Sequence, residues 1–165
     1  MSDKTPLSLL VPKDVMLLLP GAGDKLADCK ALAKRIGVGD RVIFPGHLAD
    51  VERAYYAADL FVSASCSEGL PFAMMEAMRT GLPPVASAVA GQTDLVEQGI
   101  NGLLYPRGDE KAYLAAVKKL MEKRRRTRLG QRAARSVRKY SVRNVFAADI
   151  AAFGYLRSTG RRKKR

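Results

Sequence analysis

Residues 60–77 decide the fold, and they read Leu-Phe-Val-Ser-Ala-Ser-Cys-Ser-Glu-Gly-Leu-Pro-Phe-Ala-Met-Met-Glu-Ala. The first five residues form a short apolar run, which is typical of a buried strand. Residues 65–70 are a polar loop, and Pro71 favours the first turn of a helix because its ring fixes a helical φ. We expect this helix to end before Gly81. The stretch therefore predicts a strand that leads through a polar loop into a helix.

The same alternation of apolar runs and helical periodicity continues along the chain. Further strands are predicted at 15–20, 41–44, 84–87 and 102–105, and further helices at 25–36, 51–58, 93–98, 110–123, 127–139 and 142–156. Asp50 and Asp109 are the expected caps of two of these helices. Strands that alternate with helices predict an α/β fold with a doubly wound parallel sheet.

Ligands of a doubly wound sheet bind outside the carboxyl ends of its strands. Here those ends are predicted at 21–24, 45–48, 65–70 and 88–92. In the third of these loops, Glu68 offers a carboxylate that can accept hydrogen bonds from sugar hydroxyls, and Gly69 lets the backbone approach a ligand closely. Glu76 lies about two turns into the following helix, whose first amides can receive a phosphate. The alternative is an ordinary strand–loop–helix junction in which Glu76 is solvated.

The charge of the chain is distributed unevenly. The 165 residues carry a formal net charge of +13. Residues 1–110 hold 10 Lys and Arg against 14 Asp and Glu, whereas residues 111–165 hold 19 against 2, which gives balances of −4 and +17. Any partner that charge attracts therefore binds the last third of the chain.

Composition excludes several classes of protein. No apolar run approaches the length of a membrane-spanning helix, and the first residues lack the pattern of a signal peptide. The two cysteines, Cys29 and Cys66, cannot form a disulfide framework, so we expect reduced thiols and a cytoplasmic location. His47 is the single histidine. No cluster of residues suited to a metal is evident, and we expect neither a metal nor a cofactor.

The central stretch also resembles a known family. Residues 68–78 read Glu-Gly-Leu-Pro-Phe-Ala-Met-Met-Glu-Ala-Met, and residues 81–87 read Gly-Leu-Pro-Pro-Val-Ala-Ser. Together they resemble the signature of family 4 of the retaining glycosyltransferases, which have the GT-B fold. Similar segments follow the family's order at 39–46 (Gly-Asp-Arg-Val-Ile-Phe-Pro-Gly), 57–62 (Ala-Ala-Asp-Leu-Phe-Val) and 101–106 (Asn-Gly-Leu-Leu-Tyr-Pro). The resemblance extends over residues 15–157.

The resemblance implies that residues 1–157 form the half of the enzyme that binds a nucleotide-sugar donor of the UDP or GDP type, followed by a basic tail at 158–165. Glu76 would bind the ribose hydroxyls, and Glu68 would be the catalytic residue beside the transferred sugar. The other implied donor-binding residues are Gly69, Leu70, Pro71 and Phe72 in the central loop, Gly46, His47 and Leu48 in a second turn, and Gly21 and Gly23 in a third. The leaving diphosphate would be stabilised electrostatically.

The sequence departs from the family in three places. Residues 1–14 are too few to supply the strand and helix that normally open the donor half and normally place a strand in the middle of its sheet. Residues 87–91 read Ser-Ala-Val-Ala-Gly, where the family has Asp-x-Gly-Gly, and the acceptor-binding half is absent. Transfer to a glycan or lipid-linked acceptor, as in the synthesis of envelope polysaccharides, would then need a separate acceptor-binding chain. A catalytically inactive, truncated remnant is the alternative, and whether the isolated chain is an enzyme stays open.

The basic third admits three interpretations. It is a solvated cationic face, or it binds an anionic membrane surface and places the protein peripherally at the inner membrane, or the chain is a basic module that binds nucleic acid. Nucleic acid is not the expected partner, because this region has few aromatic residues placed for stacking and no nucleic-acid motif.

Overall fold

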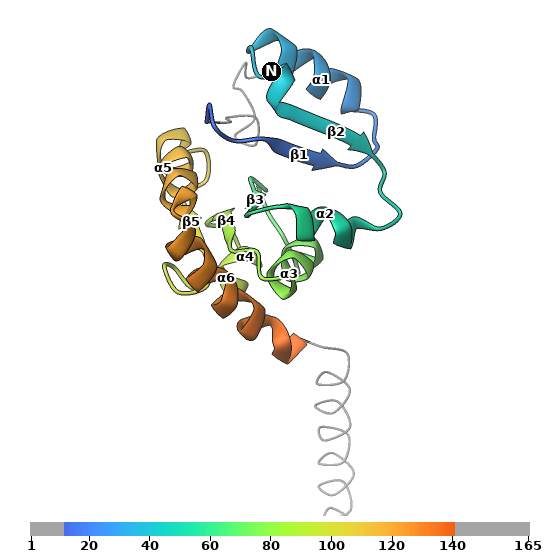
Figure 1. The fold of residues 1–165 in the computed structure, drawn as a ribbon. Coiled ribbons are helices and arrows are strands. Elements are labelled where there is room, and N and C mark those ends of the chain that lie inside the picture. The colour runs from blue at the N-terminus through green and yellow to red at the C-terminus, as the bar shows by residue number, and fades with distance from the viewer. Residues whose placement is uncertain (1–11, 141–165) are drawn as a thin grey trace, which may run out of the picture.

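The computed structural model describes residues 12–140, and its strands form two parallel sheets (Figure 1). The strands are β1 (Leu17–Pro20), β2 (Val42–Gly46), β3 (Phe61–Ser63), β4 (Pro84–Ser87) and β5 (Leu103–Tyr105). β1 pairs with β2 in one sheet, and β3, β4 and β5 pair in that order in the other. The predicted parallel α/β architecture is confirmed, but strand pairing divides it into two sheets within the described residues.

Helices flank both sheets. They are α1 (Leu26–Arg35), α2 (Val51–Ala57), α3 (Phe72–Arg79), α4 (Gln92–Leu95), α5 (Glu110–Met121) and α6 (Lys123–Ser136), with short 3-10 helices η2 (Gly39–Arg41) and η3 (Val137–Tyr140). Every predicted strand and helix that falls within residues 12–140 is present; β4 has the predicted ends, and the ends of the others are shifted. α6 begins at Lys123 rather than 127, because Glu122 alone is extended (ψ 111°) and separates it from α5. The predicted helix at 142–156 and the tail at 158–165 lie outside the described residues.

Two of the predicted helix starts need correction. Asp109 caps α5 as expected, since its side chain accepts a hydrogen bond from the Ala112 amide at 2.9 Å. Asp50 occupies the capping position of α2, but its side chain makes no capping hydrogen bond and lies 3.9 Å from Arg53 Nε instead. Pro71 is the residue before α3 rather than the first residue within it.

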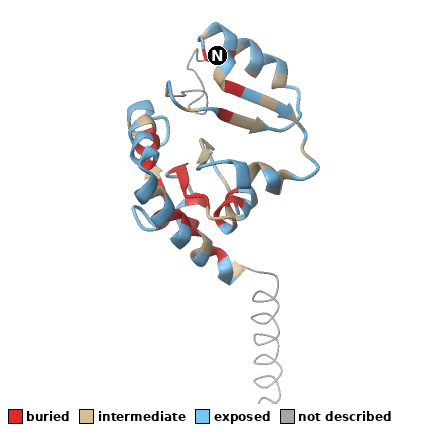
Figure 2. Ribbon diagram, viewed as in Figure 1, coloured by how far each residue is buried: buried red, intermediate tan, exposed pale blue. Residues whose placement is uncertain are grey.

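The second sheet is doubly wound around β4, all four residues of which are buried (Figure 2). Val85 faces the first apolar cluster, which α5 completes with Tyr113, Val117 and Leu120. Ala86 faces the second cluster, which α3 and α6 complete with Met74, Met78 and Ala133. A third, smaller cluster joins the first sheet to α1 through Leu17, Ala33, Val38 and Val42.

The basic helix α6 contributes one narrow face to this core. Leu129, Gly130 and Ala133 are buried, and a Cβ on Gly130 would overlap the Gly81 carbonyl oxygen. The exposed basic side chains of α6 lie around the rest of its surface: Lys123, Arg124, Arg128, Arg132 and Arg135. Glycine at position 130 therefore allows a strongly charged helix to pack directly on the turn after α3.

Candidate functional site

Because all the described strands are parallel within their sheets, the predicted loops lie at the carboxyl edges of the strands, as expected. In the first sheet, the amide of Gly21 donates to the carbonyl oxygen of Gly46 at 2.8 Å, so two predicted turns meet. The carbonyl of Gly23 accepts the Leu26 amide at 3.0 Å, where α1 opens. His47 is exposed beside Gly46. These turns leave their backbone and the imidazole open to solvent.

In the second sheet, Glu68 is held by neighbouring serines. Its carboxylate is half-buried and accepts a hydrogen bond from Ser65 Oγ at 2.6 Å. Ser65 Oγ in turn lies 3.2 Å from the Oγ of Ser63, and Ser63 is the last residue of β3. The predicted catalytic carboxylate is therefore fixed to the end of a strand rather than carried on a free loop.

The hydrogen bonds continue from these serines to a fully buried glutamine. Gln92 has no exposed surface, and its Nε2 donates to Ser63 Oγ at 2.5 Å. Because Ser63 Oγ accepts from Gln92, its own proton can point to Ser65, and the proton of Ser65 points to Glu68. Ser87 Oγ lies 2.7 Å from the Ser65 carbonyl and 3.2 Å from Gln92 Oε1. This serine–glutamine network orients three successive donors toward the Glu68 carboxylate.

Sequence reasoning missed this network. Ser63, Ser87 and Gln92 stand at or beside strand ends, where a polar side chain is read as part of a solvated loop. The one available signal was their position at the carboxyl ends of two adjacent strands, which brings short polar side chains together. Tyr105 extends the support, because its hydroxyl donates to the Ser63 carbonyl at 2.9 Å. Burial, followed by the nearby Tyr113, raises the pKa of Tyr105 to about 12.

The loop after β4 lies directly on the loop that carries Glu68. A Cβ on Gly91 would lie 2.5 Å from the Gly69 carbonyl oxygen and 2.8 Å from that of Glu68. Gly91 also has a φ of +78°, which L side chains rarely adopt. Glycine is therefore required at position 91 by both space and backbone angle. Gly69 differs, since a Cβ there would meet nothing within 4 Å.

Apolar side chains border this loop on its open side. Phe72, the first residue of α3, is 67% exposed, and Leu70 is 44% exposed. Pro71 between them is buried, and its carbonyl accepts the Met75 amide at 3.1 Å as the helix begins. Large apolar side chains with this exposure, next to an ordered carboxylate, are suited to contact with a ligand or a second protein surface.

Glu76 belongs to a separate group of side chains. It is exposed on α3, and its carboxylate accepts a hydrogen bond from Tyr55 Oη of α2 at 3.2 Å. Burial, and then the charge and hydrogen bonding of Glu76, raise the pKa of Tyr55 to about 12. The Tyr55 ring meets Phe61 edge to face, with centroids 6.4 Å apart. Glu68 and Glu76 thus present carboxylates from two separate supports, and the sequence did not identify Tyr55 as the partner of one.

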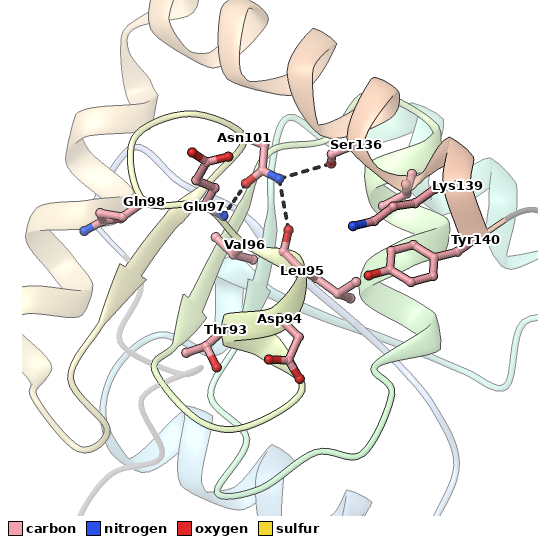
Figure 3. A pocket seen from close by; sticks show the side chains of 11 residues that line it. Thr93, Asp94, Leu95, Val96, Glu97, Gln98, Asn101, Ser136, Lys139 and Tyr140 are labelled. Atoms are coloured by element: carbon pink, nitrogen blue, oxygen red, sulfur yellow. Dashed lines mark hydrogen bonds between the residues drawn. The ribbon is translucent and has the colours of Figure 1, made fainter.

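A hollow of about 410 Å³ lies elsewhere, between α4, the turn before β5 and the end of α6 (Figure 3). Asn101 supports its wall, since Nδ2 donates to the Leu95 carbonyl at 2.9 Å and Oδ1 accepts the Glu97 amide at 2.7 Å. Nδ2 also lies 3.0 Å from Ser136 Oγ. These contacts explain the buried asparagine as a structural residue, and none of the predicted site residues lines this hollow.

Two further observations concern residues 12–140. Within this range, no three His, Cys, Asp or Glu side chains come close enough together to hold a metal ion. None of the helices there has the length and apolarity needed to cross a bilayer. Cys29 and Cys66 are both free thiols, and Cys66 is exposed.

The fold and the loops at its carboxyl edge define the Rossmann-like α/β class of the GT-B glycosyltransferases. The sequence model of the family "Glycosyl transferases group 1" matches residues 6–123. The chain belongs to this family.

Two curated relatives show how much of a longer protein the chain covers. It is 30% identical to N-acetyl-alpha-D-glucosaminyl L-malate synthase of Bacillus anthracis over 125 residues, which are 75% of this chain and 33% of that protein. It is 37% identical to alpha-monoglucosyldiacylglycerol synthase of Streptococcus pneumoniae (strain ATCC BAA-255 / R6) over 93 residues, 55% of this chain and 21% of that protein. The chain therefore spans a third or less of these relatives.

Solved structures give the same picture. Anabaena Alr3699/HepE in complex with UDP and glucose is 25% identical, with a TM-score of 0.77 over 88% of this chain and 42% of that chain. Sucrose-phosphate synthase (tll1590) from Thermosynechococcus elongatus is 25% identical, with a TM-score of 0.80 over 94% of this chain and 43% of that chain. The described residues thus have the fold of a part of these larger proteins.

Proposed function

We propose that this chain is the donor-binding half of a retaining group 1 glycosyltransferase, and that it binds a nucleotide sugar at the carboxyl edges of its strands. The observation that carries this proposal is the pair of separately supported carboxylates, Glu68 on the serine–glutamine network and Glu76 on α3. Two carboxylates on different supports can accept hydrogen bonds from two different parts of one ligand. The relative Alr3699/HepE, solved with UDP and glucose, supports the class of ligand.

In this proposal each carboxylate has its own role. Glu76 accepts hydrogen bonds from the ribose hydroxyls, and these replace the hydrogen bond that it accepts from Tyr55 in the free protein. Glu68 is the catalytic residue, held beside the transferred sugar, where its negative charge stabilises the positive charge that develops as the bond to the diphosphate breaks. The exposed backbone at Gly69 and the amides that open α3 face the sugar and the phosphates.

The other predicted residues complete the site from the first sheet. The turns at Gly21–Gly23 and Gly46–Leu48 offer backbone groups to the base and phosphates, and His47 is not assigned a chemical role. Transfer needs an acceptor-binding half, which we propose a separate chain contributes. We expect the isolated chain to show transfer near background, and robust turnover by it would contradict this part of the proposal.

Isothermal titration with UDP-glucose and a GDP-sugar tests donor binding. Glu76→Ala should weaken binding by about 10- to 100-fold, because a hydrogen bond to a charged group contributes roughly 1.5–3 kcal/mol. Glu52→Ala is the matched control, since it removes a carboxylate from the neighbouring surface, where Glu52 pairs with Arg79 at 2.9 Å. If the wild type binds neither nucleotide sugar, the donor-site proposal fails.

A second proposal concerns the exposed basic face of α6. Its five exposed cations lie on a helix that presents only a narrow apolar face to the core, so the rest can meet an anionic membrane surface and hold the protein peripherally. Sedimentation with liposomes should require anionic lipid and weaken with salt. Retention on nucleic acid but not on anionic liposomes, at physiological salt, would contradict the membrane assignment.

A further inference from the structure

We propose that α6 holds the amino edge of the second sheet against an anionic membrane, so that the candidate site opens toward the water at the opposite edge. This inference rests on the membrane contact proposed above and adds an orientation to it. It starts from the course of α6, which Figure 1 shows in orange at the periphery of the molecule.

Three contacts show that α6 crosses the amino ends of β3, β4 and β5 in that order. Near its start, Arg126 forms an ion pair at 2.8 Å with Asp59, which lies two residues before β3. Further along, Gly130 packs on the backbone of the turn between α3 and β4. Near its end, Ser136 Oγ accepts a hydrogen bond at 3.0 Å from Asn101, which lies two residues before β5. Because the three strands are parallel, α6 lies along the edge opposite the loops of the candidate site.

The outer face of α6 carries four exposed arginines, which we call the arginine stripe: Arg124, Arg128, Arg132 and Arg135. At about 100° per residue they fall within an arc of about 80°, opposite the buried Leu129 and Ala133. The stripe is about 16 Å long. α6 contains no acidic residue, and within residues 12–140 none of the four arginines forms an ion pair. Cations four residues apart on a helix repel one another, so the stripe is suited to an anionic partner that neutralises all four together.

The opposite edge of the fold has the opposite charge. The loops that join each strand to the next helix hold four acidic side chains against two basic ones, a net charge of −2: Asp24, Asp50, Glu68 and Asp109 against Lys25 and Arg107. The acidic residues that pair with α6 are Asp59 and Glu122, and they bind Arg126 and Arg125 rather than the stripe. An anionic surface therefore attracts the amino edge and repels the edge that carries the candidate site.

Exposed apolar side chains at the amino edge favour a membrane over a nucleic acid. Met121, the last residue of α5, and Ile100, in the turn before β5, are each 40% exposed. Tyr56 is 70% exposed and lines a hollow of about 370 Å³ together with Thr127 and Gln131 of α6. Tyrosine is enriched at membrane interfaces, and basic helices that lie on membranes place apolar side chains among the headgroups. A single-stranded nucleic acid would instead need aromatic rings for its bases to stack on, and the stripe has none.

This orientation fixes how far the candidate site stands from the lipid. A helix about 10 Å thick and the four residues of β4, which rise about 3.3 Å each, separate the headgroups from the carboxyl edge. The site should therefore stand roughly 20 Å from the headgroups. A nucleotide sugar then reaches it from the water.

Fluorescent labels at the two edges of the full chain test the orientation. Cys29→Ser leaves Cys66, an exposed thiol in the loop of Glu68, as the single labelling site. Gln131→Cys, combined with Cys29→Ser and Cys66→Ser, places the label on the exposed surface of α6 without changing its charge. The vesicles contain phosphatidylcholine, phosphatidylglycerol and a lipid with a spin label on its headgroup, which quenches nearby fluorophores. We expect the label of Gln131→Cys to lose about half its fluorescence or more, since it lies at headgroup depth, and the label on Cys66 to be unchanged.

Two label results would overturn the orientation while leaving the membrane contact intact. Quenching at Cys66 but not in Gln131→Cys would place the carboxyl edge on the lipid. Equal quenching of the two labels would mean that the bound protein has no fixed orientation. Failure of the full chain to bind the vesicles at all would overturn both the membrane contact and this inference.

Paired charge variants test whether the arginine stripe makes the contact. Arg128→Gln combined with Arg132→Gln should weaken vesicle binding by about 10- to 30-fold, because each cation adds to the attraction of an anionic surface. Lys30→Gln combined with Lys34→Gln is the matched control, since it removes two exposed cations, also four residues apart, from α1. The basic tail at 158–165 is kept in every variant. Equal losses in the two pairs would mean that binding follows net charge and not the stripe, which would overturn the inference.

Donor titration in the presence of vesicles tests whether the site faces the water. The affinity of the wild type for UDP-glucose should be the same on vesicles as in solution, and loss of donor binding on vesicles would contradict the orientation. If the chain binds no donor even without vesicles, the donor-site proposal fails by itself. The label and charge experiments still decide the orientation in that case, because neither uses a nucleotide sugar.

Discussion

The two parts of the candidate site differ in how firmly they are held. The loops after β3 and β4 rest on a buried glutamine, three serines and a glycine packed against backbone oxygen atoms. The turns after β1 and β2 meet through the backbone hydrogen bond between Gly21 and Gly46, and they are otherwise largely exposed. The comparison indicates that the side proposed to bind the sugar is held by more side-chain contacts within the protein than the side proposed to face the base.

Gly91→Ala should have the largest effect, because it disturbs the side proposed to bind the sugar in two ways. Its Cβ would lie 2.5 Å from the Gly69 carbonyl oxygen, and its φ of +78° is unfavourable for alanine. Strained backbone of this kind costs about 1–3 kcal/mol, and displacement of the Glu68 loop adds to that. We expect a lower melting temperature by calorimetry and donor binding weakened by more than about tenfold.

Gly46→Ala is the matched change on the other side. Gly46 has the same φ of +78°, but a Cβ there would meet nothing within 4 Å. The free energy of unfolding of this variant should fall only by the cost of placing alanine at a positive φ, about 1–2 kcal/mol. If calorimetry shows the two variants equally destabilised, the contact of Gly91 with the Glu68 loop contributes nothing, and the comparison between the two sides fails.

The sequence predicts only those features of the two sides that leave a repeating pattern of apolar and polar residues. Periodicity predicted the strands, the helices and the carboxyl-edge loops, since burial imposes it on local sequence. It could not predict that Gln92 points inward, because a single polar residue after a strand has no period. Nor could it predict the bond between Tyr55 and Glu76, which depends on how α2 packs on α3. The interrupted sheet was anticipated from the family resemblance, not from the apolar pattern.

Gln92→Leu should have the next largest effect on stability and donor binding. Leucine fills the buried space but removes one hydrogen bond from Ser63 Oγ and one from Ser87 Oγ, and a hydrogen bond typically contributes about 0.5–1.5 kcal/mol. Urea unfolding measures the loss, and Gln131→Leu on the exposed face of α6 is the control. Donor binding should weaken as Glu68 loses orientation. A Gln92→Leu chain with unchanged stability and unchanged binding would show that the serine–glutamine network is incidental.

The smallest expected effect concerns Tyr55, whose hydrogen bond to Glu76 joins α2 to α3. Its pKa is raised to about 12, chiefly by burial and next by Glu76, so folding favours the protonated phenol. This contribution to stability is complete below pH 10, the ordinary pKa, and is lost as the pH rises through 12. Absorbance titration of the phenol, compared with Tyr55→Phe, measures it. In Glu76→Gln the pKa of Tyr55 should fall but stay above 10, since burial remains. A pKa that does not change would show that the Tyr55–Glu76 hydrogen bond is not formed.

A bound ribose would compete with Tyr55 for Glu76. Adding donor sugar should therefore also lower the pKa of Tyr55, and this links the titration to the occupancy of the site.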